Sequence, residues 1–160
     1  MKTAIYAGSF DPITRGHFDI IEQALRVFDR LTIAIGINPT KQRMFPVMGA
    51  SLLIAEALRN RNLDDRVDVK SFGGALVHFA QAEKADGIVR GLRQISDFGD
   101  EFTQHGVNSK ISDIPLVYFI CHHEFLHVSS STAKQMASFN MDISWLVDAN
   151  IERALKKHYA

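Results

Sequence analysis

Ala7-Gly8-Ser9-Phe10-Asp11-Pro12-Ile13-Thr14-Arg15-Gly16-His17 joins an apolar segment to an amphipathic one near the start of the chain. The segment before it, Thr3–Ala7, is typical of a buried strand, and a helical pattern begins at Gly16. Because glycine has no Cβ, an anion can approach the backbone closely at Gly8 and Gly16. His17 stands at the start of the helix, where backbone amides are unpaired and the partial charge is positive. The stretch therefore predicts a phosphate-binding corner that contains a titratable hydrogen-bond donor.

Short apolar segments alternate with helical patterns along the rest of the chain. We expect strands at Thr3–Ala7, Leu31–Ile37, Val67–Ser71, Gly87–Arg90 and Leu116–Ile120. We expect helices near Gly16–Phe28, Ala50–Asn60, Ala75–Glu83, Ile95–Ile111, Ser131–Phe139 and Trp145–His158. This alternation predicts a Rossmann-like α/β fold, with a doubly wound five-stranded parallel sheet, helices on both faces and C-terminal helices. No repeat or linker interrupts the pattern, so we expect residues 1–160 to form a single domain.

Composition argues against several classes of protein. The chain has 18 basic and 18 acidic residues, so no overall charge attracts it to nucleic acid or to an anionic membrane. We see no signal peptide before the first strand and no apolar run of transmembrane length. The single Cys121 permits no internal disulfide, and His122, His123 and His127 lack an acidic ligand at zinc-binding spacing. We expect a cytoplasmic protein that binds neither nucleic acid nor membranes.

The residues best suited to chemistry follow the ends of the predicted strands. They are Gly8-Ser9, Asn38 to Lys41, Phe72 to Gly74, Arg90 to Arg93, and His122 to Ser131. In open α/β sheets, ligands bind beyond the carboxyl ends of the strands, where the strand order reverses. These loops are therefore predicted to form one site.

Several of the loops carry groups that suit a phosphate. The imidazole of His17 can donate to a phosphate as negative charge accumulates on it. Lys41 suits a point contact, and Arg90 with Arg93 can hold a phosphate in the bidentate way that guanidinium groups allow. Each group also has a plainer interpretation, because a histidine can simply open a helix and the cations can be solvated or paired with nearby aspartates.

Ser129, Ser130 and Ser131 open the helix that follows the last predicted strand. Serine is a strong N-cap residue, so a structural role accounts for one of the three. Three hydroxyls beside the unpaired amides of a helix start also form an anion cradle. We therefore predict that this block contacts phosphate.

Gly8–Ile20, with Thr14-x-Gly16-His17 inside it, resembles the Thr/His-x-Gly-His signature of the nucleotidyltransferase superfamily. It resembles bacterial phosphopantetheine adenylyltransferases still more closely. Later blocks agree, namely Arg90-Gly91-Leu92-Arg93, the Ser-Asp-Phe-x-x-Glu string that ends at Glu101, and Val128 to Ser131. The resemblance implies transfer of the adenylyl group of ATP to 4′-phosphopantetheine, giving dephospho-coenzyme A and pyrophosphate. The acceptor phosphate would attack the α-phosphate of ATP in line.

The resemblance also implies roles for individual residues. The catalytic residues would be His17, Lys41, Ser9 and Arg93. ATP would be bound by Ser9, Phe10, His17, Arg90, Gly91, Leu92, Arg93, Glu101, Phe125, Leu126, His127, Val128, Ser129, Ser130 and Ser131. The 4′-phosphopantetheine would be bound by Ser9, Lys41, Ala75, Leu76, Arg90 and Asn108. Mg²⁺ would bridge phosphate oxygens, because the sequence has no carboxylate cluster to hold it. A homohexamer, and coenzyme A as a feedback ligand, are implied by the resemblance alone.

Some positions depart from the family pattern, and other functions stay open. Pro46 to Ser51 carries no charge where the family usually has Glu-Glu-Arg, and Ser109 stands where an arginine is usual. A nicotinate or nicotinamide mononucleotide adenylyltransferase would use the same chemistry, but those relatives tend to carry His-x-Gly-His and an arginine after the serine block. A nucleotide-binding module without catalysis is a further alternative, against which the intact His17 and Lys41 argue.

Overall fold

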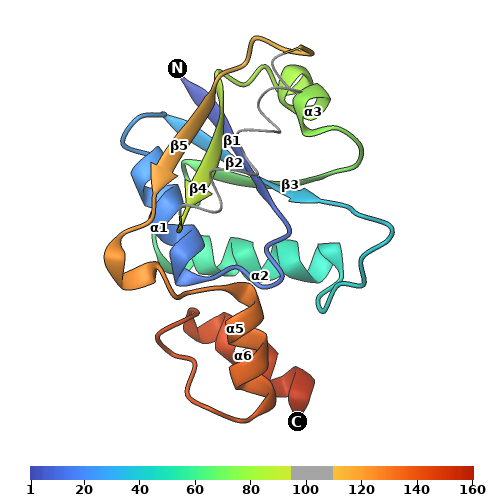
Figure 1. The fold of residues 1–160 in the computed structure, drawn as a ribbon, viewed down its shortest axis with the longest axis vertical. Helices are drawn as coiled ribbons and strands as arrows, with labels where there is room; N and C mark the ends of the chain where they lie inside the picture. Colours follow the sequence, from blue (N-terminus) through green and yellow to red (C-terminus); the bar gives the residue numbers. More distant parts are fainter. Residues whose placement is uncertain (95–109) are drawn as a thin grey trace.

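The computed structural model describes residues 1–94 and 110–160, and Figure 1 shows their arrangement. These residues contain five parallel strands in one sheet: β1 (Thr3–Gly8), β2 (Arg30–Gly36), β3 (Val67–Phe72), β4 (Gly87–Leu92) and β5 (Leu116–Ile120). The order across the sheet is β3-β2-β1-β4-β5. The direction of strand addition therefore reverses between β1 and β4, which is where such folds bind ligands.

The helices of the described residues are α1 (Arg15–Ala24), α2 (Val47–Asn60), α3 (Leu76–Ala82), α5 (Ser130–Ser138) and α6 (Ala149–Tyr159), with a short 3-10 turn η1 (His123–Phe125). The last two helices, α5 and α6, pack against each other at the lower end of the molecule in Figure 1. Across residues 1–94 and 110–160, no helix is both long enough and apolar enough to cross a membrane.

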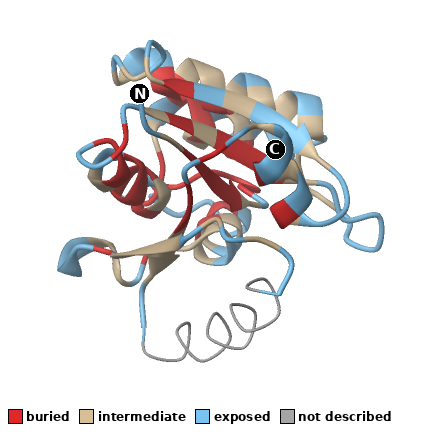
Figure 2. Cartoon of the chain, turned by 90° about the horizontal axis from the view of Figure 1, so that it is seen from above, coloured by how far each residue is buried: buried red, intermediate tan, exposed pale blue. Residues whose placement is uncertain are grey.

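Helices pack against both faces of the sheet, and successive side chains of a strand point to opposite faces. Ala4 and Tyr6 of β1 belong to a large core that includes α1, α2, α5 and α6. Ile5 and Ala7 of the same strand belong to a smaller core, where they meet Ala80 of α3. Figure 2 shows these buried residues in red along the strands and on the inner sides of the helices. The expected doubly wound parallel sheet is thus confirmed.

All of the predicted strands are present, and β4 is longer than we expected. The sequence predicted that Arg90 ends the strand, yet Gly91 and Leu92 continue it by pairing with Phe119 and Ile120 of β5. The glycine allows this extension, because a Cβ at position 91 would lie 2.8 Å from Cγ1 of Ile20.

Some helix boundaries were predicted wrongly. The first helix ends at Ala24 rather than Phe28. The residues after it turn towards β2, and the guanidinium of Arg66 stabilises this turn by donating to the carbonyls of Leu25, Phe28 and Asp29. The last helix begins at Ala149 rather than Trp145, since residues 143–147 form a separate turn before it. The helix expected near Ile95–Ile111 falls mainly on residues 95–109, which lie outside the described residues.

Candidate active site

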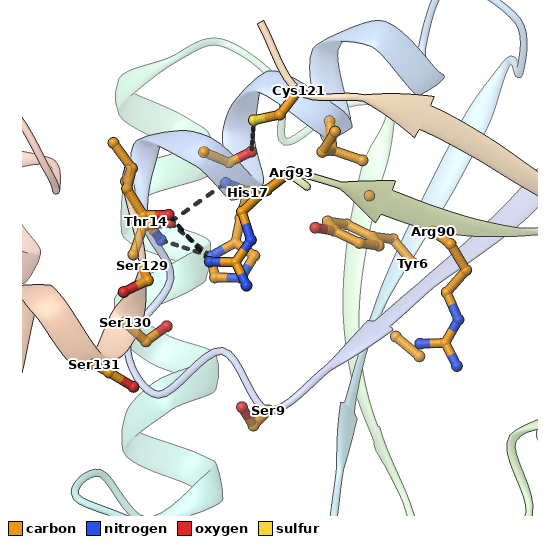
Figure 3. Close-up of a pocket in the computed structure, with 15 residues that line it drawn as sticks. Tyr6, Ser9, Thr14, His17, Arg90, Arg93, Cys121, Ser129, Ser130 and Ser131 are labelled. Carbon is orange, nitrogen blue, oxygen red and sulfur yellow. Dashed lines mark hydrogen bonds between the residues drawn. The ribbon is translucent and has the colours of Figure 1, made fainter. Parts of the chain in front are cut away.

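A cavity of about 330 Å³ opens at the carboxyl ends of β1 and β4. Its walls also include the start of α1 and the start of α5 (Figure 3). Of the residues predicted for the site, those that line it are Ser9, His17, Arg90, Gly91, Arg93, Val128, Ser129, Ser130 and Ser131. Segments from both ends of the chain therefore meet at one place, as the strand order requires.

The side chain of His17 is held by the helix that it helps to open. Thr14 is the N-cap of α1 and His17 is the third residue of the helix. The amide of Thr14 donates to Nδ1 of His17 at 2.9 Å, while the amide of His17 donates to Oγ1 of Thr14 at 3.4 Å. The two residues thus form a capping box, with histidine in the place usually taken by glutamate or glutamine.

The surroundings of His17 keep its ring neutral. Burial, together with the positive charge of Arg93, lowers the pKa of His17 to about 4. At neutral pH the ring can therefore carry one proton only, and Nδ1 already accepts the amide of Thr14. The proton is on Nε2, so this side chain can act as a neutral hydrogen-bond donor to an oxyanion.

The two predicted arginines stand at different parts of the cavity wall. Arg90 lies inside β4, and Figure 3 shows it across the cavity from the serine block. Arg93 follows β4 and lies beside His17, with Nη1 donating to the carbonyl of Val128 at 3.4 Å. Two cations on separate sides suit an elongated or divided anion better than a single small one.

The three serines have different partners. Ser129 is the N-cap of α5 and accepts from the amide of Thr132 at 3.0 Å, which is the structural role expected for one of them. Ser130 donates through Oγ to the carbonyl of Pro12 at 2.7 Å and so joins α5 to the loop before α1. Ser131 is exposed. The block therefore both builds the cavity wall and presents hydroxyls to it.

Lys41 lines a second cavity, of about 220 Å³, rather than the first. The two cavities share Ser9, Ser130 and Ser131, so they are neighbours. Asn38 shapes the loop before the lysine, because its Oδ1 accepts from the amide and the hydroxyl of Thr40. The structure thus places Lys41 next to the His17 cavity, with Ser9 between them.

Several predicted residues line neither cavity. They are Phe10, Leu92, Phe125, Leu126, His127, Ala75 and Leu76. The Phe10 ring is buried, with its centroid 5.3 Å from that of Tyr6 and 5.1 Å from that of His17. Its side chain supports the His17 ring and does not face the cavity. Glu101 and Asn108 lie outside the described residues.

Sequence reasoning missed a buried carboxylate two residues after His17. Asp19 accepts from the amide of His122 at 2.8 Å and from Nε2 of Gln23 at 3.2 Å, and it also bonds to Nδ1 of His122. Burial works against the charge of Asp19, but the hydrogen bonds from His122 outweigh it and hold the pKa of Asp19 below its usual value. These bonds join α1 to the segment after β5. Only the nearness of Asp19 to His17 in the sequence could have drawn attention to Asp19.

Cys121 also lines the first cavity, although we predicted no role for it there. Burial, followed by the carboxylate of Asp19, raises the pKa of its thiol to about 12. The thiol is therefore protonated at neutral pH and is a packing group rather than a nucleophile. In residues 1–94 and 110–160 we find no group of three or more His, Cys, Asp or Glu side chains that could hold a metal ion.

Comparison with known sequences gives a consistent answer. Residues 5–136 match the family described as cytidylyltransferase-like. The chain is 38% identical over 158 residues to the phosphopantetheine adenylyltransferase of Desulfosudis oleivorans, an alignment that covers 98% of this chain and 92% of the relative. It is 41% identical over 160 residues to the phosphopantetheine adenylyltransferase of Moorella thermoacetica, covering 99% of this chain and 98% of the relative.

Solved structures share the fold. A candidate nicotinate-nucleotide adenylyltransferase from Vibrio parahaemolyticus superposes with a TM-score of 0.72 at 19% identity, covering 99% of this chain and 95% of that one. A bifunctional NMN adenylyltransferase/ADP ribose pyrophosphatase from Francisella tularensis gives a TM-score of 0.68 at 16% identity, covering 98% of this chain and 49% of that one. At such identities the likeness concerns the arrangement of the strands and helices alone.

Proposed function

This chain belongs to the cytidylyltransferase-like family and, within it, to the phosphopantetheine adenylyltransferases, and we therefore propose that it transfers the adenylyl group of ATP to 4′-phosphopantetheine. The products are dephospho-coenzyme A and pyrophosphate. The observation that carries the proposal is the 2.9 Å hydrogen bond from the amide of Thr14 to Nδ1 of His17. It leaves an Nε2–H donor at the cavity, which is the group that a reacting α-phosphate needs.

The reaction needs positioning and charge stabilisation rather than a general base. The acceptor phosphate is already ionised at neutral pH, so one of its oxygens attacks the α-phosphorus of ATP directly. A new P–O bond forms while the bond to the bridging oxygen of the β-phosphate breaks, and pyrophosphate leaves with that electron pair. Holding the two phosphates in line supplies much of the rate enhancement.

We assign the acceptor phosphate to Ser9, Lys41 and Arg90, and the triphosphate to His17 and Arg93. The neighbouring cavities support the separation of Lys41 from His17 and Arg93, because Ser9 lines both cavities, Lys41 only the second, and His17 and Arg93 only the first. Arg90 lines the first cavity too, so its place with the acceptor is proposed from the family resemblance. The acceptor and the α-phosphate would then meet near Ser9. ATP would further contact Ser129 to Ser131 at the start of α5, where unpaired amides and hydroxyls favour an anion.

Mg²⁺ fits the site as a partner of ATP. The described cavity walls offer hydroxyls and cationic side chains, and hydroxyl oxygen is a suitable outer ligand for a hydrated Mg²⁺. Ser129, Ser130 and Ser131 are the residues that would hold its water. When bound, the ion neutralises part of the charge on the phosphate oxygens.

Three further properties are proposed from family membership. The chain would assemble as a homohexamer, coenzyme A would bind as a feedback ligand, and the protein would work in the cytoplasm. Sedimentation analysis of the purified protein tests the first. Inhibition of pyrophosphate release by added coenzyme A tests the second.

The activity is tested by offering ATP and Mg²⁺ with either 4′-phosphopantetheine or nicotinate mononucleotide, in separate reactions, and following pyrophosphate. We expect release with phosphopantetheine alone, and dephospho-coenzyme A by mass spectrometry. Release only with the mononucleotide would keep the chemistry and change the acceptor. ATP binding without pyrophosphate in either reaction would make the chain a nucleotide-binding module.

A further inference from the structure

Two sets of hydrogen bonds join the turn that carries Ser9 to the loop that carries Lys41, and each segment supplies the side chain for one set. Asp11, in the first, accepts the amide of Met44 at 2.8 Å and the amide of Phe45 at 3.0 Å. Arg43, in the second, donates through Nη2 to the carbonyl of Ser9 at 2.7 Å. Each segment therefore uses a charged side chain to fix the backbone of the other.

Arg43 is itself held in place. Its Nε donates to the carbonyl of Phe45 at 3.0 Å, and its Nη2 lies 4.0 Å from Oδ1 of Asp11. Only 15% of the side chain is exposed, which is low for an arginine on a surface loop. The planar guanidinium presents donors in a fixed fork, so one side chain can reach two carbonyls that a lysine could not reach together.

The turn at Ser9 needs such support from outside. The next residue, Phe10, has a φ of 44°, in the left-handed region that non-glycine residues rarely adopt. Its ring is buried beside Tyr6 and His17, which fixes the turn on the inner side. The bond from Arg43 fixes the carbonyl of Ser9 on the outer side. A strained turn that is held from both sides keeps one shape.

We infer that Arg43 is a positioning residue that sets the distance between Ser9 and Lys41, and through them the position of the acceptor phosphate. This inference rests on the proposed function, which gives those two side chains the acceptor. The second cavity fits the role, because Lys41, Arg43 and Lys134 line it, and Asp11 is the one carboxylate among the described residues of its wall. The excess of positive charge also favours an anion there.

The test compares Arg43→Gln and Arg43→Lys with Arg26→Gln, a change at an exposed arginine just after α1. The complete protein is assayed with ATP, Mg²⁺ and 4′-phosphopantetheine, and the dissociation constant for ATP is measured by calorimetry. We expect Arg43→Gln to lower kcat/KM for phosphopantetheine at least tenfold and to change ATP affinity less than threefold. Arg43→Lys should recover only part of the loss, and Arg26→Gln should match the unchanged protein.

Hydrogen exchange supplies a measurement that does not depend on activity. We expect Arg43→Gln to speed exchange of the amides in residues 38–45 and around Ser9, while exchange in β2 and α1 stays slow. Unchanged exchange there, or an unchanged kcat/KM, would overturn the inference, as would an equal loss of ATP affinity. Failure of the unchanged protein to use phosphopantetheine would overturn the proposed function instead, and faster exchange would still show that Arg43 holds the two segments.

Discussion

The backbone amide of Thr14 donates to Nδ1 of His17 over 2.9 Å, and this one contact determines which ring nitrogen faces the cavity with a proton. In most capping boxes the third helical residue is glutamate or glutamine, whose only task is to accept that amide. A histidine does the same with one nitrogen and keeps the other for chemistry. The start of α1 is therefore both a helix cap and the support of a hydrogen-bond donor.

His17→Ala should lower kcat by about a hundredfold or more, because it removes a donor to the charge that develops on the α-phosphate. The same change removes half of the capping box, which we expect to lower the free energy of unfolding by about 1 kcal/mol. Pyrophosphate release and urea unfolding measure the two effects separately. Near-normal turnover would show that His17 only caps the helix.

The acid sensitivity of folding should depend on His17. Its pKa is about 4 in the folded protein and near the usual 6.5 when unfolded. As pH falls from 6.5 towards 4, the unfolded chain gains a proton that the folded chain does not, so the free energy of unfolding falls. Urea unfolding across this range should show a smaller fall in His17→Gln than in the unchanged protein. An equal fall in both would mean that the ring is charged in the folded state at mildly acidic pH.

Local sequence patterns predicted most of the fold. The central strands β1 and β2 are short, mostly apolar runs with side chains buried on both faces, and such a run can be recognised from its own residues alone. The cavity followed from the same reasoning, because parallel strands place their carboxyl ends at one edge. The position of Ser9, His17, Arg90 and Arg93 around one cavity could be expected for this reason.

What local patterns could not predict are the contacts between distant segments. Asp19 and His122 are 103 positions apart, and Arg43 and Ser9 are 34 apart. Their pairing depends on how loops from different strands lie beside one another, which side-chain periodicity does not encode. The end of β4 was predicted wrongly for a related reason. We expected the strand to end at Arg90, whereas Gly91 leaves room for the side chain of Ile20 beside a strand that continues to Leu92.

Gly91→Ala should destabilise the protein, because the new Cβ would lie 2.8 Å from Cγ1 and 3.2 Å from Cδ1 of Ile20. Overpacking of this kind costs about 1–3 kcal/mol. Ile20→Ala removes both atoms, so the cost of Gly91→Ala should largely disappear when Ile20 is already alanine. A double-mutant cycle by urea unfolding measures this coupling. Additive effects would mean that the loss comes from the strand backbone rather than from the contact with α1.

Asp19→Asn should weaken the link between α1 and the segment that leads from β5 to the serine block. An amide can accept from the backbone nitrogen of His122 but provides weaker bonds to Gln23 and to the His122 ring than a carboxylate does. We expect the free energy of unfolding at pH 7 to fall by about 1–3 kcal/mol, with an increase in KM for ATP because Ser129 to Ser131 lose a support.

The pH dependence separates this effect from a general loss of packing. Because the pKa of Asp19 is held below its usual value of 3.8, its carboxylate stabilises the folded protein above that pH, and the contribution disappears as pH falls through the lower folded-state pKa. The difference between the unchanged protein and Asp19→Asn should therefore be full at pH 7 and shrink below pH 3.8. Asp64→Asn, at an exposed position after α2, is the matched control and should show no such difference. A gap between the two proteins that stays constant down to the acid limit would mean that the shape of the side chain, and not its charge, holds His122 to α1.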